Sequence, residues 1–167
     1  SLNILFTDKT GTLTRGKLQV SRLVSGDGTL YQSPAALKRK SLWEMVELSC
    51  ARNNESMASG GKALGGNATD RALLEYVLPL SPRLEQTDDR GRIPFDSTRK
   101  FSAVRLRGPK KYTLVKGAPE KILPACSRYF DVDGQVCPLQ NRSRVSTAWN
   151  EMTSHAMRVI ALAVSET

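Results

Sequence analysis

Near its start the chain reads Asp8-Lys9-Thr10-Gly11-Thr12-Leu13-Thr14, a stretch that follows the short apolar segment 2–6. That segment is rich in β-forming residues, as expected of a buried parallel strand. Asp8 is therefore expected just past the carboxyl end of a strand, where ligands bind in open α/β sheets. Gly11 lets the backbone approach a phosphate closely, and Lys9 adds positive charge nearby. We interpret the stretch as a phosphate-accepting loop.

A carboxylate in such a loop can attack a γ-phosphoryl group and form an aspartyl-phosphate. Mg²⁺ and cationic groups must then neutralise the charge that spreads over the transferring oxygens. The alternative is an ordinary strand-to-turn loop, because Asp, Thr and Gly are common turn residues. All seven positions of the stretch match a known phosphorylation motif, described next, and this match after an apolar strand favours the phosphate-accepting loop.

The heptapeptide resembles the phosphorylation motif of the P-type ATPases, ion and lipid pumps that pass through an aspartyl-phosphate. The resemblance implies that Asp8, Lys9 and Thr10 are catalytic, with Asp8 as the nucleophile, and that Asp8 and Thr10 bind Mg²⁺ in the intact protein. The family's catalytic domain belongs to the haloacid-dehalogenase group, whose soluble phosphatases carry a second Asp two positions after the nucleophile. Thr10 occupies that position here, so the acyl-phosphate is expected to hydrolyse slowly, as a pump requires.

Composition indicates one cytosolic globular domain, or one domain with a piece of another. The chain has 167 residues, of which 40% are hydrophobic and 25% charged, as is normal for a soluble protein. Its three cysteines show no Cys-x-x-Cys spacing, which fits a reducing compartment. No apolar run approaches the roughly 18 residues of a membrane span. If the chain belongs to a pump, it is expected to be only part of it.

The formal charge of +9 invites a nucleic-acid interpretation. However, the basic residues occur in small scattered groups with few neighbouring aromatic residues to stack on bases. Most of them are therefore expected on a solvated surface, and no nucleic-acid partner is expected. A nucleotide's phosphates would need only a few of these charges.

The hydrophobic pattern along the rest of the chain predicts both helices and strands. The glycine-rich segment 59–66 lacks the spacing of a P-loop and is interpreted as a flexible connection. Helices are expected from Ser33-Pro34 to Asn53-Asn54, over residues 67–79, briefly after Pro119, and around Val145 and Trp149; strands over 17–24, 30–31, 92–104 with a central bend, 112–115 and 158–163; and a hairpin turn at Asp133-Gly134.

Residues 67–70, Asn-Ala-Thr-Asp, open the second of these helices. An Asp in the first turn stabilises a helix through the macrodipole, which is the simplest role for Asp70. The segment also resembles the Gly-Glu-Ala-Thr-Glu segment of type II P-type pumps, whose last acidic residue contacts the adenine of ATP. The resemblance gives this contact to Asp70, whose side chain is one methylene shorter.

Residues 94–100 resemble the Pro-Phe-x-Ser-x-x-Lys region of P-type nucleotide domains. The resemblance implies that Phe95 stacks on adenine and that Lys100 approaches the phosphates. Many relatives place an Arg two residues after the Phe, but this chain has Ser97, so Arg99 is expected to make that phosphate contact. Without the resemblance, Phe95 could simply belong to the core and Lys100 to the solvated surface.

Two further stretches complete the nucleotide signature. Residues 116–120 form the complete Lys-Gly-Ala-Pro-Glu motif of type II pumps, in which the Lys lines the base of the adenine pocket, so Lys116 and Gly117 are expected there. Chemically, the motif is otherwise a strand-to-helix turn with a surface lysine. The strand from Arg158 resembles the family's Leu-Arg-x-Leu-Ala strand, which implies that Arg158 reaches the β-phosphate and Ile160 packs on the nucleotide.

The joint match predicts an α+β fold, α/β overall: a twisted antiparallel sheet flanked by helices. Residues 25–167 are expected to form the nucleotide-binding domain, and residues 1–24 the first strand, phosphorylation loop and hinge strand of a haloacid-dehalogenase-like domain. The remaining phosphorylation, actuator and membrane domains of the pump are expected elsewhere.

The predicted function is the cytosolic ATP-binding portion of an ATP-driven cation pump in a membrane, with ATP and Mg²⁺ as cofactors and calcium as the suggested ion. The isolated chain is expected to be soluble, to bind adenine nucleotide and to turn over nothing. The alternatives are a soluble phosphatase that uses Asp8 and a basic module that binds anions or nucleic acid.

Overall fold

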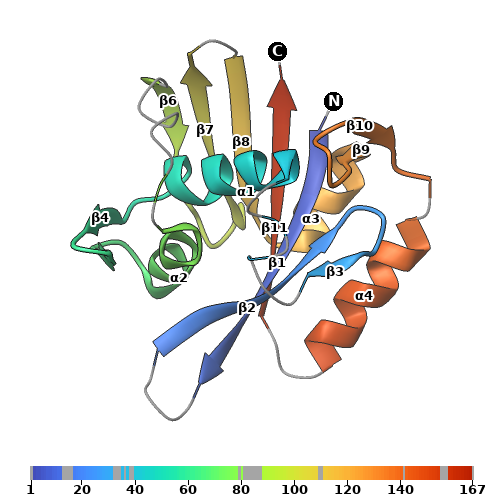
Figure 1. The fold of residues 1–167 in the computed structure, drawn as a ribbon, viewed down its shortest axis with the longest axis horizontal. Helices are drawn as coiled ribbons and strands as arrows, with labels where there is room; N and C mark the ends of the chain where they lie inside the picture. Colours follow the sequence, from blue (N-terminus) through green and yellow to red (C-terminus); the bar gives the residue numbers. More distant parts are fainter. Residues whose placement is uncertain are drawn as a thin grey trace.

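The structure is a computed structural model that describes residues 2–12, 17–31, 35, 37, 40–78, 80, 88–108, 111–140, 142–154 and 158–166. Helices and strands alternate irregularly along the chain, as an α+β fold predicts (Figure 1). The strands are β1 (Leu2–Thr12), β2 (Lys17–Ser25), β3 (Leu30–Tyr31), β4 (Met57–Ser59), β5 (Lys62–Leu64), β6 (Asp88–Ile93), β7 (Phe101–Arg107), β8 (Lys111–Gly117), β9 (Cys126–Phe130), β10 (Val136–Pro138) and β11 (Arg158–Glu166), and the helices are α1 (Ser41–Arg52), α2 (Ala68–Val77), α3 (Pro119–Ile122), followed by a 3-10 turn (Leu123–Ala125), and α4 (Arg142–Ser154).

Nine of these strands form one sheet in the order β10-β9-β1-β11-β8-β7-β6, with β2 beside β1 and β3 beside β2. Its pairs are antiparallel apart from β1 with β9. The strands β4 and β5 form a separate two-stranded hairpin. The predicted antiparallel sheet with flanking helices is confirmed.

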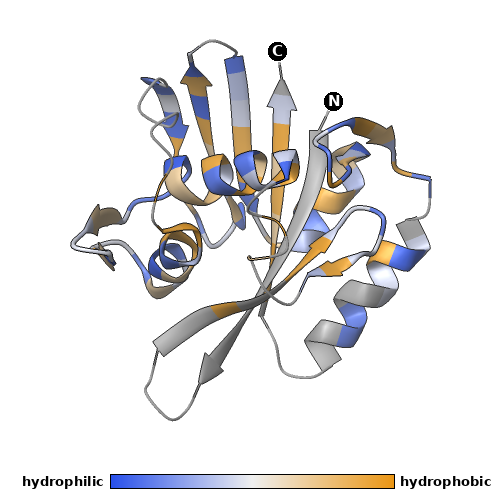
Figure 2. Cartoon of the chain, viewed as in Figure 1, coloured by the Kyte–Doolittle hydropathy of each residue, from blue (hydrophilic) through white to orange (hydrophobic). Residues whose placement is uncertain are grey.

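Both faces of the centre of the sheet are buried, because alternate residues of the central strand β11 enter different cores. Leu162 and Val164 belong to a core with residues of α1 and α2. Ala161 and Ala163 belong to a second core, which includes Ile122 and other residues of α3, α4 and the 3-10 turn. The hydrophobic segments of β7, β8 and β11 are visible in orange in Figure 2. Helices therefore cover both faces at the centre of the sheet, whereas the edge strand β6 is exposed, and the face covered by α1 and α2 carries the candidate site.

The first predicted loop takes a different form in the structure. Asp8 does not follow a strand, because β1 continues to Thr12. The strand continues because residues 8–12 pair with β2, with a register shift between Asp8 and Lys9. The expectation of a loop that begins at Asp8 is therefore wrong. The strand β1 belongs to the same sheet as the rest of the chain, and the division into domains at residues 1–24 and 25–167 stays a prediction.

Two other local predictions need correction. The helix α1 begins at Ser41, because Lys40 is extended with φ −105° and ψ 151°, whereas the predicted start at Ser33-Pro34 lies outside the described residues. The glycine-rich segment is not a loose connection but the hairpin of β4 and β5. Gly60 and Gly61 form its two-residue turn with φ values of 56° and 77°, which glycine adopts without steric cost.

Candidate functional site

A pocket of about 310 Å³ lies where the carboxyl end of α1 and the amino end of α2 approach one end of the sheet. Its volume is in the range of small-molecule sites, which runs from roughly 300 to 1,000 Å³. The lining combines apolar and polar side chains from six separate parts of the sequence. These residues are Asn53, Asn54 and Glu55 after α1; Asn67, Thr69 and Asp70 at the start of α2; Arg92, Ile93, Pro94 and Phe95 at the end of β6; and Ser102, Lys116, Gly117 and Ile160 on the sheet.

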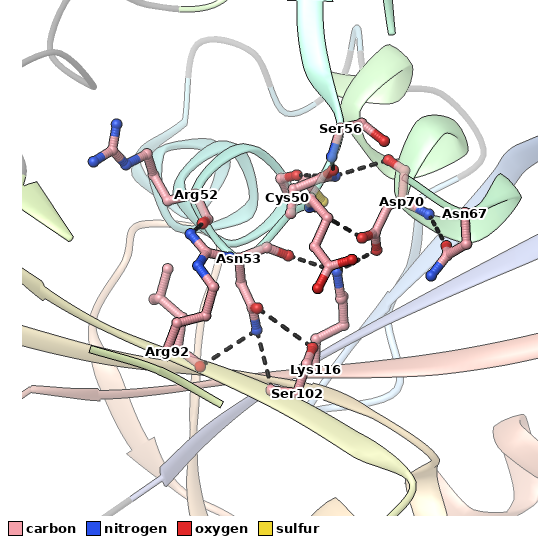
Figure 3. A network of polar contacts seen from close by, with 12 residues as sticks. Cys50, Arg52, Asn53, Ser56, Asn67, Asp70, Arg92, Ser102 and Lys116 are labelled. Atoms are coloured by element: carbon pink, nitrogen blue, oxygen red, sulfur yellow. Dashed lines mark hydrogen bonds and ion pairs between the residues drawn. The ribbon is translucent and has the colours of Figure 1, made fainter. Parts of the chain in front are cut away.

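A buried ion pair joins the sheet to α2 at this pocket. Lys116 lies two residues after the core residue Leu114, so its side chain points to the same face of β8. Its Nζ donates to Asp70 Oδ1 at 2.6 Å and to the carbonyl oxygen of Asn53 at 2.5 Å (Figure 3). The exposed fractions of the Lys116 and Asp70 side chains are only 8% and 7%. The pocket therefore contains a charged lysine whose position is fixed by two hydrogen bonds.

The start of α2 places Asp70 for this contact. Asn67 is the N-cap, and its side-chain oxygen accepts from the Asp70 N–H at 2.8 Å, as an N-cap side chain does for an N–H of the first turn. The Asn54 side chain donates to the carbonyl oxygens of Asp70, at 2.7 Å, and Cys50, at 2.8 Å. These bonds tie the end of α1 to the start of α2.

Asn53 ties the same end of α1 to the sheet. Its side-chain nitrogen donates to the carbonyl oxygen of Ser102 at 3.2 Å, and its side-chain oxygen accepts from Ser102 Oγ at 3.3 Å (Figure 3). Asn53 is only 2% exposed, so these polar groups are satisfied away from water. The backbone carbonyl that receives Lys116 is therefore held in place by the side chain of the same residue.

The turn between β6 and β7 carries the aromatic side of the pocket. Phe95 is 56% exposed, so it presents a ring face that the core does not use. Asp96 organises the turn, because its Oδ1 accepts from the N–H groups of Thr98, at 2.6 Å, and Arg99, at 3.1 Å. The backbone N–H groups of Arg99 and Thr98 hold the pKa of Asp96 below its usual range.

Gly117 is required where the turn meets β8. A Cβ atom at this position would lie 2.4 Å from the Lys100 carbonyl oxygen and 2.7 Å from Phe101 Cα. Lys100 itself has a φ of 63°, and its carbonyl accepts from the Ala118 N–H at 3.0 Å. The close approach at Gly117 is thus made by the β6–β7 turn of the chain itself.

Five of the predicted nucleotide contacts meet in the pocket: Asp70, Phe95, Lys116, Gly117 and Ile160. Two others do not line it. The Arg99 guanidinium donates to the Pro94 carbonyl at 3.0 Å and lies 5.8 Å from the centre of the Phe101 ring, and Lys100 Nζ lies 3.9 Å from a carboxylate oxygen of Glu120. The side chain of Arg158 lies outside the described part of the chain, as do those of Asp8, Lys9 and Thr10.

Sequence reasoning missed seven polar lining residues, namely Asn53, Asn54, Glu55, Asn67, Thr69, Arg92 and Ser102. Arg92 donates to the Arg52 carbonyl at 3.1 Å, at the end of α1. For Asn53 and Asn54, the sequence signal was their position at the end of an amphipathic helix, which usually marks only a helix end. In the structure the same two residues also line the pocket. Nothing in the sequence around Ser102 distinguishes it from other strand serines.

Within the described residues, no group of three or more His, Cys, Asp or Glu side chains is placed to hold a metal ion. The Mg²⁺ site predicted at Asp8 and Thr10 depends on side chains outside that description and stays a prediction. No described helix is long and apolar enough to cross a membrane.

The family model of the P-type ATPase cytoplasmic domain N matches residues 41–167. The chain belongs to this family. Calcium-transporting ATPase 1 of Yarrowia lipolytica is 31% identical over 191 residues, which cover 99% of this chain and 21% of that relative. Calcium-transporting ATPase lmo0841 of Listeria monocytogenes is 30% identical, and calcium-transporting ATPase type 2C member 2 of Mus musculus 31%, each over 96% of this chain. The chain spans about a fifth of the length of these relatives.

Proposed function

We propose that the pocket binds the base of an adenine nucleotide and that the chain is the ATP-binding portion of an ATP-driven cation pump. The observation that carries the proposal is the convergence of Asp70, Phe95, Lys116 and Ile160, from four distant stretches, on one pocket. Phe95 offers an exposed ring for stacking, and Ile160 adds apolar contact. Lys116 supplies a buried N–H donor for a ring nitrogen.

The phosphates would extend from the pocket along the β6–β7 turn. Lys100 lies there with a side chain that is 51% exposed, and its ion pair with Glu120 is long, at 3.9 Å. Exposed pairs of this kind contribute little, so Lys100 can exchange Glu120 for a phosphate at small cost. Arg92 and Arg99 would supply further positive charge for the same purpose, and the family resemblance gives a phosphate contact to Arg158 as well.

In the whole pump, Asp8 would accept the γ-phosphoryl group, with Lys9 and Thr10 beside it and Mg²⁺ bound by Asp8 and Thr10. Mg²⁺ would neutralise charge on the transferring oxygens. We propose calcium as the transported ion, because the relatives described above are named calcium-transporting ATPases. The phosphorylation, actuator and membrane domains would be the partners of this chain within the same protein.

Titration of the ¹⁵N-labelled chain with ATP tests the proposal. We expect shifts of the Phe95, Lys116, Gly117 and Ile160 backbone signals at millimolar ATP. If these signals stay unchanged, the pocket does not bind nucleotide. Tripolyphosphate is the matched ligand without a base, and binding as strong as that of ATP would indicate a general anion site instead.

A substitution refines this test. Phe95→Ala is expected to weaken ATP binding about tenfold, because stacking of a base on an aromatic ring contributes roughly 1–3 kcal/mol. The fold should be retained, since the ring is mostly exposed. Met57→Ala is the matched control, because Met57 is 74% exposed and does not line the pocket. Equal affinities of the two variants would contradict stacking on Phe95.

A further inference from the structure

The carboxylate of Asp70 is engaged on both oxygens within the protein. Oδ1 accepts from Lys116 Nζ at 2.6 Å, and Oδ2 accepts from the backbone N–H of Glu55 at 3.1 Å. The side chain is 7% exposed. A ligand that donates a hydrogen bond to this carboxylate would therefore have to reach a buried group that already accepts two hydrogen bonds within the protein.

Lys116 is held from two sides. Asp70 lies at the start of α2 and the Asn53 carbonyl at the end of α1, and both accept from the same Nζ (Figure 3). A lysine ammonium is a compact charge on a flexible stem with three rotatable donors. When two donors are fixed by helix ends that are themselves tied together through Asn54, the direction of the third donor is fixed as well.

We propose that Asp70 is a positioning residue for Lys116 and does not contact the exocyclic amino group of the base. In this arrangement Lys116 donates its third N–H to a ring nitrogen of the purine, and Asp70 holds the ammonium for that contact. The inference rests on the proposed nucleotide binding and departs from the contact that the sequence resemblance assigns to Asp70.

The balance of interactions favours this role. To accept from an amino group, Asp70 would have to share oxygens that already receive Lys116 and the Glu55 N–H, on a side chain that is only 7% exposed. Any shift of the carboxylate toward the base would also weaken its buried ion pair, which costs more than one hydrogen bond to a neutral amino group returns. The short aspartate side chain also keeps the carboxylate against Glu55 and Lys116, at the first turn of α2.

The decisive experiment compares ATP with purine riboside triphosphate, which keeps the ring nitrogens but lacks the 6-amino group. Dissociation constants of both are measured for the wild-type chain and for Asp70→Asn. A positioning role predicts that both affinities fall by the same factor, on the order of tenfold, so that their ratio stays within about twofold of the wild-type ratio. A direct contact predicts that ATP loses several-fold more than the analogue, which would overturn the proposal.

One further measurement and one control variant guard the result. If Asp70→Asn does not fold, the wild-type chain is used alone: a positioning role predicts that ATP and the analogue bind within about twofold of each other, and ATP binding that is several-fold tighter would contradict the proposal. Asp88→Asn removes an exposed carboxylate, whose ion pair with Arg90 spans 3.8 Å, and should leave both affinities unchanged.

A spectroscopic measurement reports on Lys116 itself. In the ¹⁵N-lysine spectrum, the Nζ protons of Lys116 should exchange slowly in the wild type and become unobservable in Asp70→Asn. Persistence of the slow signal in that variant would overturn the positioning role. If the wild type binds neither nucleotide, the proposed function fails, and a slow Nζ signal would then assign the ion pair to structure alone.

Discussion

Replacement of Lys116 by methionine tests the energetics of the buried ion pair. The substitution keeps much of the side-chain volume but removes two charge-assisted hydrogen bonds, at 2.5 and 2.6 Å. Each such bond contributes about 1.5–3 kcal/mol, and a buried pair that loses one partner is typically destabilised by about 3–5 kcal/mol. We expect a loss of about 3–5 kcal/mol in the free energy of unfolding, because the Asp70 side chain, 7% exposed, is left without its cationic partner.

Urea denaturation, followed by circular dichroism and tryptophan fluorescence, measures this loss. The double variant Lys116→Met with Asp70→Asn removes the stranded charge and should recover at least 2 kcal/mol of it, since neutral replacements of buried pairs are often tolerated. The control is Lys100→Met, whose exposed pair with Glu120 should contribute less than about 1 kcal/mol. A loss below about 1 kcal/mol for Lys116→Met, or no recovery in the double variant, would refute the reasoning.

Three other outcomes are expected. Gly117→Ala should lower stability by about 1–3 kcal/mol and weaken ATP binding, because its Cβ meets backbone atoms, whereas Gly91→Ala, which has open space, should change little in the same denaturation and titration. The pKa of Asp96 is lowered in the folded state, so its contribution to stability is complete above the unfolded pKa of about 3.9 and is lost as the pH falls through the folded pKa. Asp96→Ala should therefore lower the free energy of unfolding, measured in urea, more at pH 7 than at pH 3. Burial raises the pKa of Cys50 to about 12, so Ellman's reagent at pH 8 should label the partly exposed Cys137 in the native chain and Cys50 only after unfolding.

Local patterns predicted most strands, whereas the residues expected in the pocket came from the resemblance to P-type nucleotide domains, and their contacts with a nucleotide stay a prediction. The alternation over residues 101–107 and 111–117 fixes which side chains face α1 and α2, and Lys116 follows from that period. The N-cap signal at Asn67 placed the start of α2, and with it Asp70, correctly. Residues close in the sequence were therefore enough to predict an element where they also determine its backbone conformation, as the N-cap Asn67 does for α2.

The failures have a different origin. The segment after Asp8 extends as a strand because β2 pairs with it, and no residue within the segment reports that partner. The Gly60-Gly61 turn carried a hairpin signal, but its flanking strands of three residues each are too short for their alternation to be recognised. The ion pair of Asp70 and Lys116 joins residues 46 positions apart, so each motif could be interpreted only as an independent ligand contact.

The buried ion pair is an inefficient way to stabilise the fold, and this bears on its purpose. A methionine and an asparagine could fill much of the same space without the cost of desolvating two charges. What only Lys116 supplies is an ammonium of fixed direction at the wall of the pocket, and Asp70 and the Asn53 carbonyl are the groups that fix it. A double variant that regains stability but not ATP binding would separate the two roles. Under the proposed function, the pair serves recognition of the base, with stability as a secondary effect.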